Sequence, residues 1–406
     1  MLPKEIYHSK SDYSSLVFSG GELKVKESGF STGYGVRILE DGRLGFGYCQ
    51  DENLEKALSV ASRLSKFSSK SSFSFAPESK YQSVVISDPK IDPYDYETIK
   101  SFVDQAYEGA ESRGGKSRVI CSMENRFTSI KNTSGFFGEY SKTGFSIYVE
   151  CMDGDGFGYK SFSSSKAPQN THSIGNEAAE MARAMKGAKK PESGKYSLVM
   201  EIEAIETLLE ILLPSFSGDW KRRSISRIEV GKKSFSDLLT MHDDPLSPGI
   251  NTHPFDDEGI PSSKRTLVEN GVIQSFLYDR ETAALSGVEE CGSCNRESYS
   301  SQPSLSSSNI VISPGSLNNF DELDNYLEVH SAHGSHTANP TTGDFGLEAS
   351  TAFLVNKGKR TPVRGFMISG NIFDFFSKIS GMEKKQNVHG SLISPRIAFS
   401  DVDIIS

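Results

Sequence analysis

The first fifty residues alternate polar and apolar side chains between glycines, and this alternation restricts the N-terminal part of the chain to β-structure. Successive side chains of a strand point to opposite faces, so the alternation predicts strands that bury one face. The segment Glu40-Asp41-Gly42-Arg43 predicts a hairpin turn, because Gly42 can adopt a positive φ. The strands predicted from this pattern cover residues 14–18, 23–28, 34–39 and 44–48.

Three segments of the N-terminal half instead repeat apolar residues at the three- and four-residue spacing of a helix. In the first segment, Leu54, Leu58, Ala61 and Leu64 form the apolar stripe, and Asp51 precedes them as the N-cap. The other two helices are predicted at about 93–112 and at 175–186. Further strands are predicted at residues 118–124, 128–132, 138–140 and 144–151.

A domain boundary is predicted at the charged, proline- and glycine-containing stretch from Lys189 to Gly194. Beyond it, a strand is expected at 196–200 and a helix at 202–213. Short strands and glycine turns dominate the remainder, with helices expected only at 282–285 and 372–379. We therefore predict an α+β fold with two domains. These are an N-terminal α+β domain of antiparallel sheet with helices (1–190) and a C-terminal β-rich, barrel-like domain (195–406).

Charge and composition exclude several classes of protein. The formal net charge is −9, from 44 basic and 53 acidic residues, whereas contacts to nucleic-acid phosphates come from lysine and arginine. The densest basic cluster, at 221–227, is local, so direct nucleic-acid binding is not expected. The N-terminus lacks the basic segment and apolar core of a secretory signal. No apolar run approaches the roughly 18 residues of a membrane span. We expect a cytoplasmic protein without a membrane segment.

The C-terminal half carries nine short phrases in a fixed order. They are HDDP (242–245), FDDEG (255–259), VENGVI (268–273), FLYDR (276–280), NRESY (295–299), ISPG (312–315), TTGDF (341–345), PVRG (362–365) and SGN (369–371). Together they resemble the TldD/PmbA family, whose members were once described as modulators of DNA gyrase. The N-terminal phrases at 35–37 and 41–46 are also similar, so the resemblance covers nearly the whole chain.

The resemblance implies a comparison with the metal site of TldD-type subunits. There an HExxxH motif on the helix after the domain boundary supplies two histidine ligands of zinc and a general base, and a cysteine near the C-terminus supplies another ligand. In the matching segment of this chain Glu203 remains, but Ile202 and Thr207 occupy the histidine positions. Isoleucine has no lone pair, and a neutral threonine hydroxyl is a poor zinc ligand. His389 lies roughly at the cysteine position and is the one remaining candidate ligand.

What the resemblance implies is therefore a non-catalytic, TldE/PmbA-type subunit of a TldD/TldE metalloprotease complex. Such a subunit needs no cofactor of its own, because zinc is expected in a TldD-type partner. The expected assembly is a heterodimer with that partner or a homodimer, acting on short or unfolded peptides. The residues expected to line the cleft are His336, Asp344, His389, Asp256 and Glu258.

Two other functions stay open at this level. The chain could be an independent metallopeptidase that uses His330, His333, His336, His389 or Cys294, or it could be a scaffold or regulatory protein of the gyrase-modulator type. Three histidines at 330, 333 and 336 could bind a metal only if a helix aligned them, and Gly334 argues for a loop.

Each of the remaining motifs has a structural interpretation as well as a functional one. Cys291 and Cys294 form a CxxC pair, which could be half of a zinc knuckle, a redox pair or an incidental pair. The carboxylates at 243–244 and 256–258 could perform acid–base chemistry, bind a hard cation or form turns. The glycine-rich run at 154–158 is not followed by the strand-to-helix context and lysine of a phosphate loop.

Overall fold

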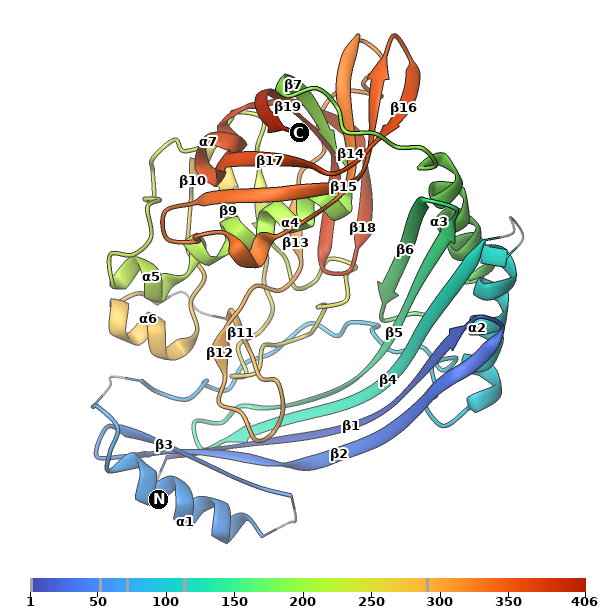
Figure 1. The fold of residues 1–406 in the computed structure, drawn as a ribbon. Coiled ribbons are helices and arrows are strands. Elements are labelled where there is room, and N and C mark those ends of the chain that lie inside the picture. Colours follow the sequence, from blue (N-terminus) through green and yellow to red (C-terminus); the bar gives the residue numbers. More distant parts are fainter. Residues whose placement is uncertain (1–2, 51–52, 71–72, 112–114, 290–291) are drawn as a thin grey trace.

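The computed structural model describes residues 3–50, 53–70, 73–111, 115–289 and 292–406 (Figure 1). The predicted N-cap Asp51 and the predicted pair member Cys291 lie outside these ranges. Among the described residues, none of the helices combines the length and the apolar character that a bilayer crossing demands.

The N-terminal half forms one long antiparallel sheet of six strands in the order β3-β2-β1-β4-β5-β6. Figure 1 shows this sheet curving beneath the C-terminal half, with α1 at one end and α2 and α3 at the other. The predicted turn at Gly42 is confirmed, because Glu40 pairs with Arg43 and both intervening residues have positive φ. The elements are β1 (Lys4–Ser19), β2 (Glu22–Glu40), β3 (Arg43–Cys49), α1 (Leu54–Ser65), α2 (Tyr96–Glu111), β4 (Lys116–Asn132), β5 (Phe137–Asp153), β6 (Gly156–Ser164) and α3 (His172–Ala184).

Several pairs of short strands predicted from the sequence are single long strands in the structure. In β4, Val119, Cys121 and Met123 are buried in the core formed with α2 and α3. Farther along the same strand, Thr128 and Ile130 are buried, and Ile130 belongs to a different cluster, with Phe255 of the C-terminal half. The buried face therefore changes from odd to even positions. The alternation of buried and exposed residues changes its register within β4, but the strand itself continues. The breaks predicted within β2, β4 and β5 were therefore wrong.

The C-terminal half contains a closed ring of five strands. The ring runs β7-β14-β15-β17-β19 and closes because β19 also pairs with β7. This closure and the antiparallel N-terminal sheet confirm the predicted α+β class with a barrel-like C-terminal part. The ring strands are β7 (Gly194–Met200), β14 (Asn325–His333), β15 (Asp344–Asn356), β17 (Phe366–Asn371) and β19 (Leu392–Ile405).

Shorter elements surround this ring. The strands β8, β9, β10 and β13 extend the sheet from β19, β16 pairs with β15, β18 pairs with β19, and β11 pairs with β12. Their bounds are β8 (Met241–Asp243), β9 (Arg265–Glu269), β10 (Val272–Ile273), β11 (Cys294–Asn295), β12 (Ser304–Leu305), β13 (Ile310–Ile312), β16 (Lys359–Val363) and β18 (Ile379–His389). The helices are α4 (Ile202–Leu212), α5 (Gly218–Arg222), α6 (Arg280–Ser286) and α7 (Ile372–Ser377), with 3-10 turns η1 (Leu213–Phe216) and η2 (Ser335–Thr337).

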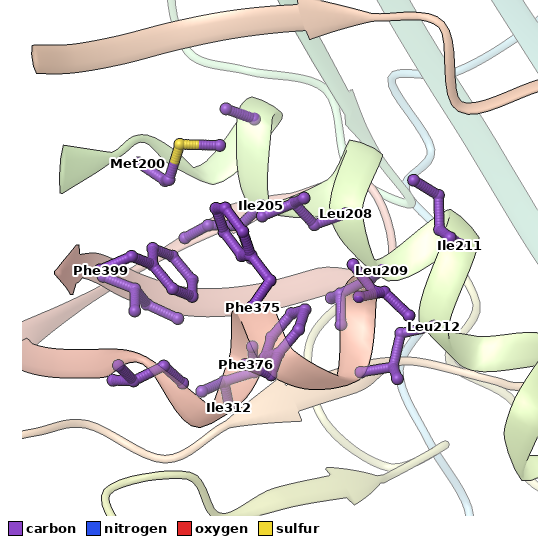
Figure 2. Close-up of a cluster of buried hydrophobic side chains, with 14 of the residues drawn as sticks. Met200, Ile205, Leu208, Leu209, Ile211, Leu212, Ile312, Phe375, Phe376 and Phe399 are labelled. Carbon is purple, nitrogen blue, oxygen red and sulfur yellow. The ribbon is translucent and has the colours of Figure 1, made fainter. Parts of the chain in front are cut away.

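Helix α4 lies at the centre of the largest hydrophobic core. Figure 2 shows Leu209 and Leu212 of α4 near Phe376 of α7, with Phe399 of β19 beside Phe375. Seven of its eleven residues are buried, so its position is fixed by packing on several sides. The first turn of this helix is the segment that the sequence comparison singled out.

A buried ion network joins the N-terminal sheet to the C-terminal half. We use this name for Glu5 of β1, Arg37 of β2, Glu258 and Arg296. Arg37 donates from Nη2 to Glu5 Oε2 over 2.8 Å and from Nη1 to Glu258 Oε1 over 2.7 Å. Arg296 donates from Nη2 to Glu5 Oε1. All four residues are at most 1% exposed.

Gly35 lets the chain near residue 299 approach the sheet beside this network. A Cβ at Gly35 would lie 2.5 Å from the carbonyl oxygen of Tyr299. That atom belongs to the backbone and cannot move aside like a flexible side chain. Only a glycine therefore fits at this strand position.

The Gly35→Ala substitution should lower the free energy of unfolding by about 1–3 kcal/mol through overpacking. Without that contact, alanine in a strand would be expected to stabilise by roughly 0.5–1 kcal/mol. Urea unfolding measures the difference, and Gly194→Ala is the control, since the nearest atom to its Cβ lies 3.8 Å away. A stabilised Gly35→Ala protein would contradict this packing.

Candidate functional site

The first turn of α4 faces a cavity between the two halves of the chain. Glu201 is the only residue between β7 and α4, so the strand fixes where the helix begins. The cavity has a volume of about 350 Å³. Residues of β6 and α3 from the N-terminal half line it, together with Glu201 and residues of α4, β14, β15 and β16 from the C-terminal half. The lining residues are Tyr159, Lys160, Glu177, Glu180, Met181, Ala184, Glu201, Ile202, Glu203, His330, Ser331, Thr351, Phe353 and Arg360.

Ile202 and Thr207 offer no suitable metal-binding atoms at the two positions that the resemblance names. Ile202 is 8% exposed and its side chain belongs to the main hydrophobic core. The Thr207 hydroxyl lies 3.2 Å from the carbonyl oxygens of both Glu203 and Ala332. Its proton is therefore directed to main-chain oxygens, and a neutral hydroxyl is a weak zinc ligand. The residues at these positions do not fit a zinc ion.

Glu203 connects α4 to the edge strand β6. Its carboxylate is a hydrogen-bond partner of the Tyr159 side chain, and burial together with this carboxylate raises the pKa of Tyr159. Lys160 Nζ lies 3.9 Å from Glu203 Oε1. The Glu203 carboxylate therefore lies between a tyrosine hydroxyl and an ammonium group that both come from β6.

His389, at the end of β18, lies against the same helix. Its Nε2 is 3.4 Å from Glu206 Oε2, and its Nδ1 is 3.9 Å from Glu203 Oε1. Burial of the ring opposes protonation, but the hydrogen bond to Glu206 and the charges of Glu206 and Glu203 outweigh it and raise the pKa of His389. The structure thus brings together His389 and the α4 segment, as the resemblance implied; a role for His389 in the cleft stays a prediction.

A second group of side chains in the cavity could coordinate a cation by geometry alone. Ligand atoms of Glu201, Glu328 and His330 all lie within 4.8 Å of one another. However, Arg396 Nη1 lies 3.1 Å from Glu201 Oε1, and Arg360 donates to Glu328 Oε1. Arg396 also pairs with Glu383, so the two guanidinium groups are shared among three carboxylates. A metal ion would still have to compete with the ion pairs that hold Glu201 and Glu328.

The other predicted cleft residues lie elsewhere. Among the residues that the structure describes, the cavity lining includes neither His336, which is exposed on η2, nor Asp344 at the start of β15. Asp344 accepts hydrogen bonds from Asn371 over 3.0 Å and from Thr342 over 2.7 Å, which lower its pKa and order a turn. His333 is exposed on β14, so the three histidines do not converge.

Asp256 and Glu258 lie at the seam with the N-terminal sheet. Together with Cys294 they place one ligand atom each within 4.8 Å of one another. Both oxygens of Glu258 accept hydrogen bonds, from Arg37 and from the Arg280 backbone over 2.7 Å. Glu258 therefore joins distant segments of the chain. Because Cys291 is outside the described residues, nothing follows for the predicted CxxC pair.

Sequence reasoning missed the residues that enclose Glu203 and Glu201. Tyr159 and Lys160 come from β6, which precedes α4 by some forty residues and belongs to another sheet. Arg360 and Arg396 come from β16 and β19, which no local pattern connects with α4. Only the positions of the strands in space bring these charges together, so no signal in the sequence could have identified them.

Comparison with known proteins places these features in a wider context. Sequence profiles of one family match along the chain: the PmbA/TldA metallopeptidase C-terminal domain at residues 193–406, its domain 1 at 5–65 and its central domain at 89–186. An uncharacterized protein of Methanocaldococcus jannaschii is 29% identical, over 97% of this chain and 94% of that protein. A Methanothermobacter thermautotrophicus protein named as a metalloprotease is 27% identical, over 93% and 87% respectively.

Solved structures share the fold along the whole chain. A Thermotoga maritima protein described as a candidate modulator of a DNA gyrase has a TM-score of 0.91 at 24% identity, covering 99% of this chain and 96% of that chain. TldE from Thermococcus kodakarensis has a TM-score of 0.89 at 22% identity, covering 100% and 97%.

The His389→Gln substitution tests the contact between β18 and α4. Because the folded-state pKa of His389 is raised, its contribution is fully present below about pH 6.5 and is lost as the pH rises through the raised value. We expect the substitution to lower the free energy of unfolding near pH 6 by less than about 1 kcal/mol, since the pair is partly exposed, and by less near pH 9. Urea unfolding of both proteins at the two pH values measures this. An equal effect at both pH values would show that protonation plays no part.

Proposed function

The chain belongs to the PmbA/TldD metallopeptidase family, and from this premise we propose that it is the non-catalytic subunit of a two-subunit peptidase. In this proposal a second member of the family carries an HExxxH motif, holds the zinc ion and performs the hydrolysis. The present chain supplies one wall of the cleft. We place the complex in the cytoplasm, on the composition of the chain.

One observation carries the proposal. The chain has eight histidines and none of them is followed by glutamate, so the sequence contains no HExxxH motif. At the matching positions of α4, Ile202 is packed in the core and Thr207 is bonded to the main chain. The remaining His389 is a single ligand, whereas a catalytic zinc site usually has three protein ligands.

Peptides are the proposed substrates because the cavity beside α4 is bordered by an edge strand. Strand β6 is the last strand of its sheet, and it contributes Tyr159 and Lys160 to the cavity lining. An extended peptide can bind at such an edge through main-chain hydrogen bonds, which do not depend on its sequence. The relative named as a metalloprotease supports the same class of substrate.

An independent metallopeptidase is the alternative that a specific observation favours. The cluster of Glu201, Glu328 and His330 has the proximity that a metal site requires. Its pairing with Arg360 and Arg396 makes it the weaker candidate. The two functions differ in a simple way, because only the alternative predicts cleavage by the purified chain alone.

The first prediction concerns the complex. A family member with an intact HExxxH motif, co-purified with this chain, should cleave an unfolded peptide at least about tenfold faster than that partner alone, because both walls are needed to enclose the substrate. Cleavage is measured by mass spectrometry of the products. The control is a partner in which the motif glutamate is replaced by glutamine, and this complex should be inactive. Equal cleavage without this chain, and no complex, would disprove the proposal.

The second prediction concerns the pocket. The double substitution Ile202→His with Thr207→His should create a zinc site with His389, since His389 contacts Glu203 and Glu206, the residues next to the two substituted positions. Metal analysis after dialysis should give about one zinc ion per chain, as expected for three protein ligands. The single substitutions Ile202→His and Thr207→His are the matched controls and should retain much less. A double variant that folds but retains no zinc would show that the pocket differs in more than its ligands.

A further inference from the structure

A second cavity, of about 110 Å³, lies at the seam beside the buried ion network. Its floor is the face of the N-terminal sheet that is turned toward the C-terminal half. Arg126 of β4 pairs directly with Lys142 of β5, and Thr128 pairs with Tyr140, so these four side chains share one face of the sheet. Tyr7 of β1 completes this floor.

The opposite wall comes from two segments of the C-terminal half. They are residues 251–257, which include His253, Asp256 and Asp257, and residues 292–308, which include Cys294. The cavity is therefore formed only where the sheet and the C-terminal half meet. Lys142 and Arg126 at its edge are partly exposed to solvent, whereas Asp256 is 2% exposed.

Asp256 presents a carboxyl oxygen that has no partner. Its Oδ1 accepts hydrogen bonds from the backbone nitrogens of Glu258 over 3.0 Å and Ile260 over 2.8 Å. Within the described part of the chain, the buried Oδ2 has no hydrogen-bond partner. A buried polar atom without a partner costs free energy and requires an explanation. Burial and the charge of Glu258 raise the pKa of Asp256 to about 8, which a cationic ligand group would reverse.

Lys142 presents an ammonium group in the same cavity. No hydrogen bond or ion pair joins its Nζ to another residue in the described ranges, whereas the neighbouring Arg126 is paired with Glu124 over 2.8 Å. Burial and the charge of Arg126 lower the pKa of Lys142 to about 8. Two adjacent cations at the edge of a cavity attract an anionic group. The cavity thus contains a carboxyl oxygen without a hydrogen-bond partner. It also contains an ammonium group on which the charges of Asp257 and Glu124 act, without a direct hydrogen bond to either in the described ranges.

We propose that this cavity binds a small zwitterion of the α-amino acid class, whose carboxylate contacts Lys142 and Arg126 and whose ammonium group contacts Asp256. A water molecule occupies about 30 Å³ of liquid, so the cavity has room for the heavy atoms of a small amino acid. Asp257 also lines the cavity, and its Oδ2 accepts from the Arg296 backbone over 2.7 Å. Its charge acts on Arg126 and Lys142, so it lies near the two cations. The inference does not depend on the proposed partner subunit.

A divalent cation is a less suitable occupant. The geometric set of Asp256, Glu258 and Cys294 includes Glu258, whose oxygens are already bonded to Arg37 and to a backbone nitrogen. Burial, with the neighbouring carboxylates, raises the pKa of the Cys294 thiol well above its ordinary value.

Equilibrium dialysis of the full chain against radiolabelled glycine, alanine and serine tests the proposal. We expect saturable binding of at least one of them with one site per chain. Because both charged groups of the ligand are recognised, N-acetylglycine and glycinamide should each bind at least about tenfold more weakly than glycine. Diglycine, whose charges are farther apart, distinguishes a free amino acid from a peptide and should also bind more weakly.

Two substitutions identify the site. Lys142→Met and Asp256→Asn should each weaken binding at least about tenfold, because each removes one charged contact. Asparagine retains the Oδ1 acceptor of the turn, so Asp256→Asn should still fold, and thermal unfolding checks this. The exposed Lys90→Met is the matched control and should bind as the parent chain does.

The other outcomes overturn the proposal. Equal binding of N-acetylglycine would indicate an anion site only, and equal binding of glycinamide would indicate a cation site only. Stoichiometric zinc binding that is lost in Asp256→Asn would indicate a metal site instead. Absence of binding by all these probes would mean that the cavity holds only water.

Discussion

The arrangement of the two halves depends on the buried ion network of Glu5, Arg37, Glu258 and Arg296. Glu5 and Arg37 are cross-strand partners in β1 and β2, so the sheet holds one half of the network rigidly. Burial opposes ionisation of Glu5, but Arg37 and Arg296 outweigh it and keep the pKa of Glu5 below its ordinary value. Removing one member of such a network leaves a buried charge without a partner, which typically costs about 3–5 kcal/mol. Both cavities lie between parts of the chain that this network joins, so their shapes depend on it.

The sequence was sufficient for the fold class and for most of the helices, because these depend on local patterns; the short helix α5 was not predicted. Helix α4 was predicted within one residue, since its apolar spacing and Pro214 are both visible in the sequence. The long strands were not predicted, because β4 buries odd positions against α2 and α3 and even positions against the C-terminal half. A strand with one core on each face cannot be recognised before both neighbours are known. The boundary proposed between residues 190 and 195 falls between α3 and β7.

Residues of the candidate site could be predicted only where they lie close together in one segment of the sequence. Ile202, Glu203 and Thr207 lie on one helical turn and a half, and His389 was placed near them by resemblance; the structure brings His389 within 3.9 Å of Glu203. The residues that decide the electrostatics come from distant strands. Arg396 pairs with Glu201 and Arg360 pairs with Glu328, and neither arginine lies near α4 in the sequence. The predicted group of cleft residues was likewise separated by the fold, with Asp256 and Glu258 at the seam.

The central claim is that this family member does not hold the catalytic metal. The most direct test is metal analysis of the purified, unmodified chain after dialysis against zinc, alone and in complex with a partner that has an HExxxH motif. The account predicts less than about 0.1 equivalent of zinc on the chain alone, because two ligand positions are lost, and about one equivalent in the complex. A full equivalent of zinc on the chain alone, with peptide cleavage, would contradict it.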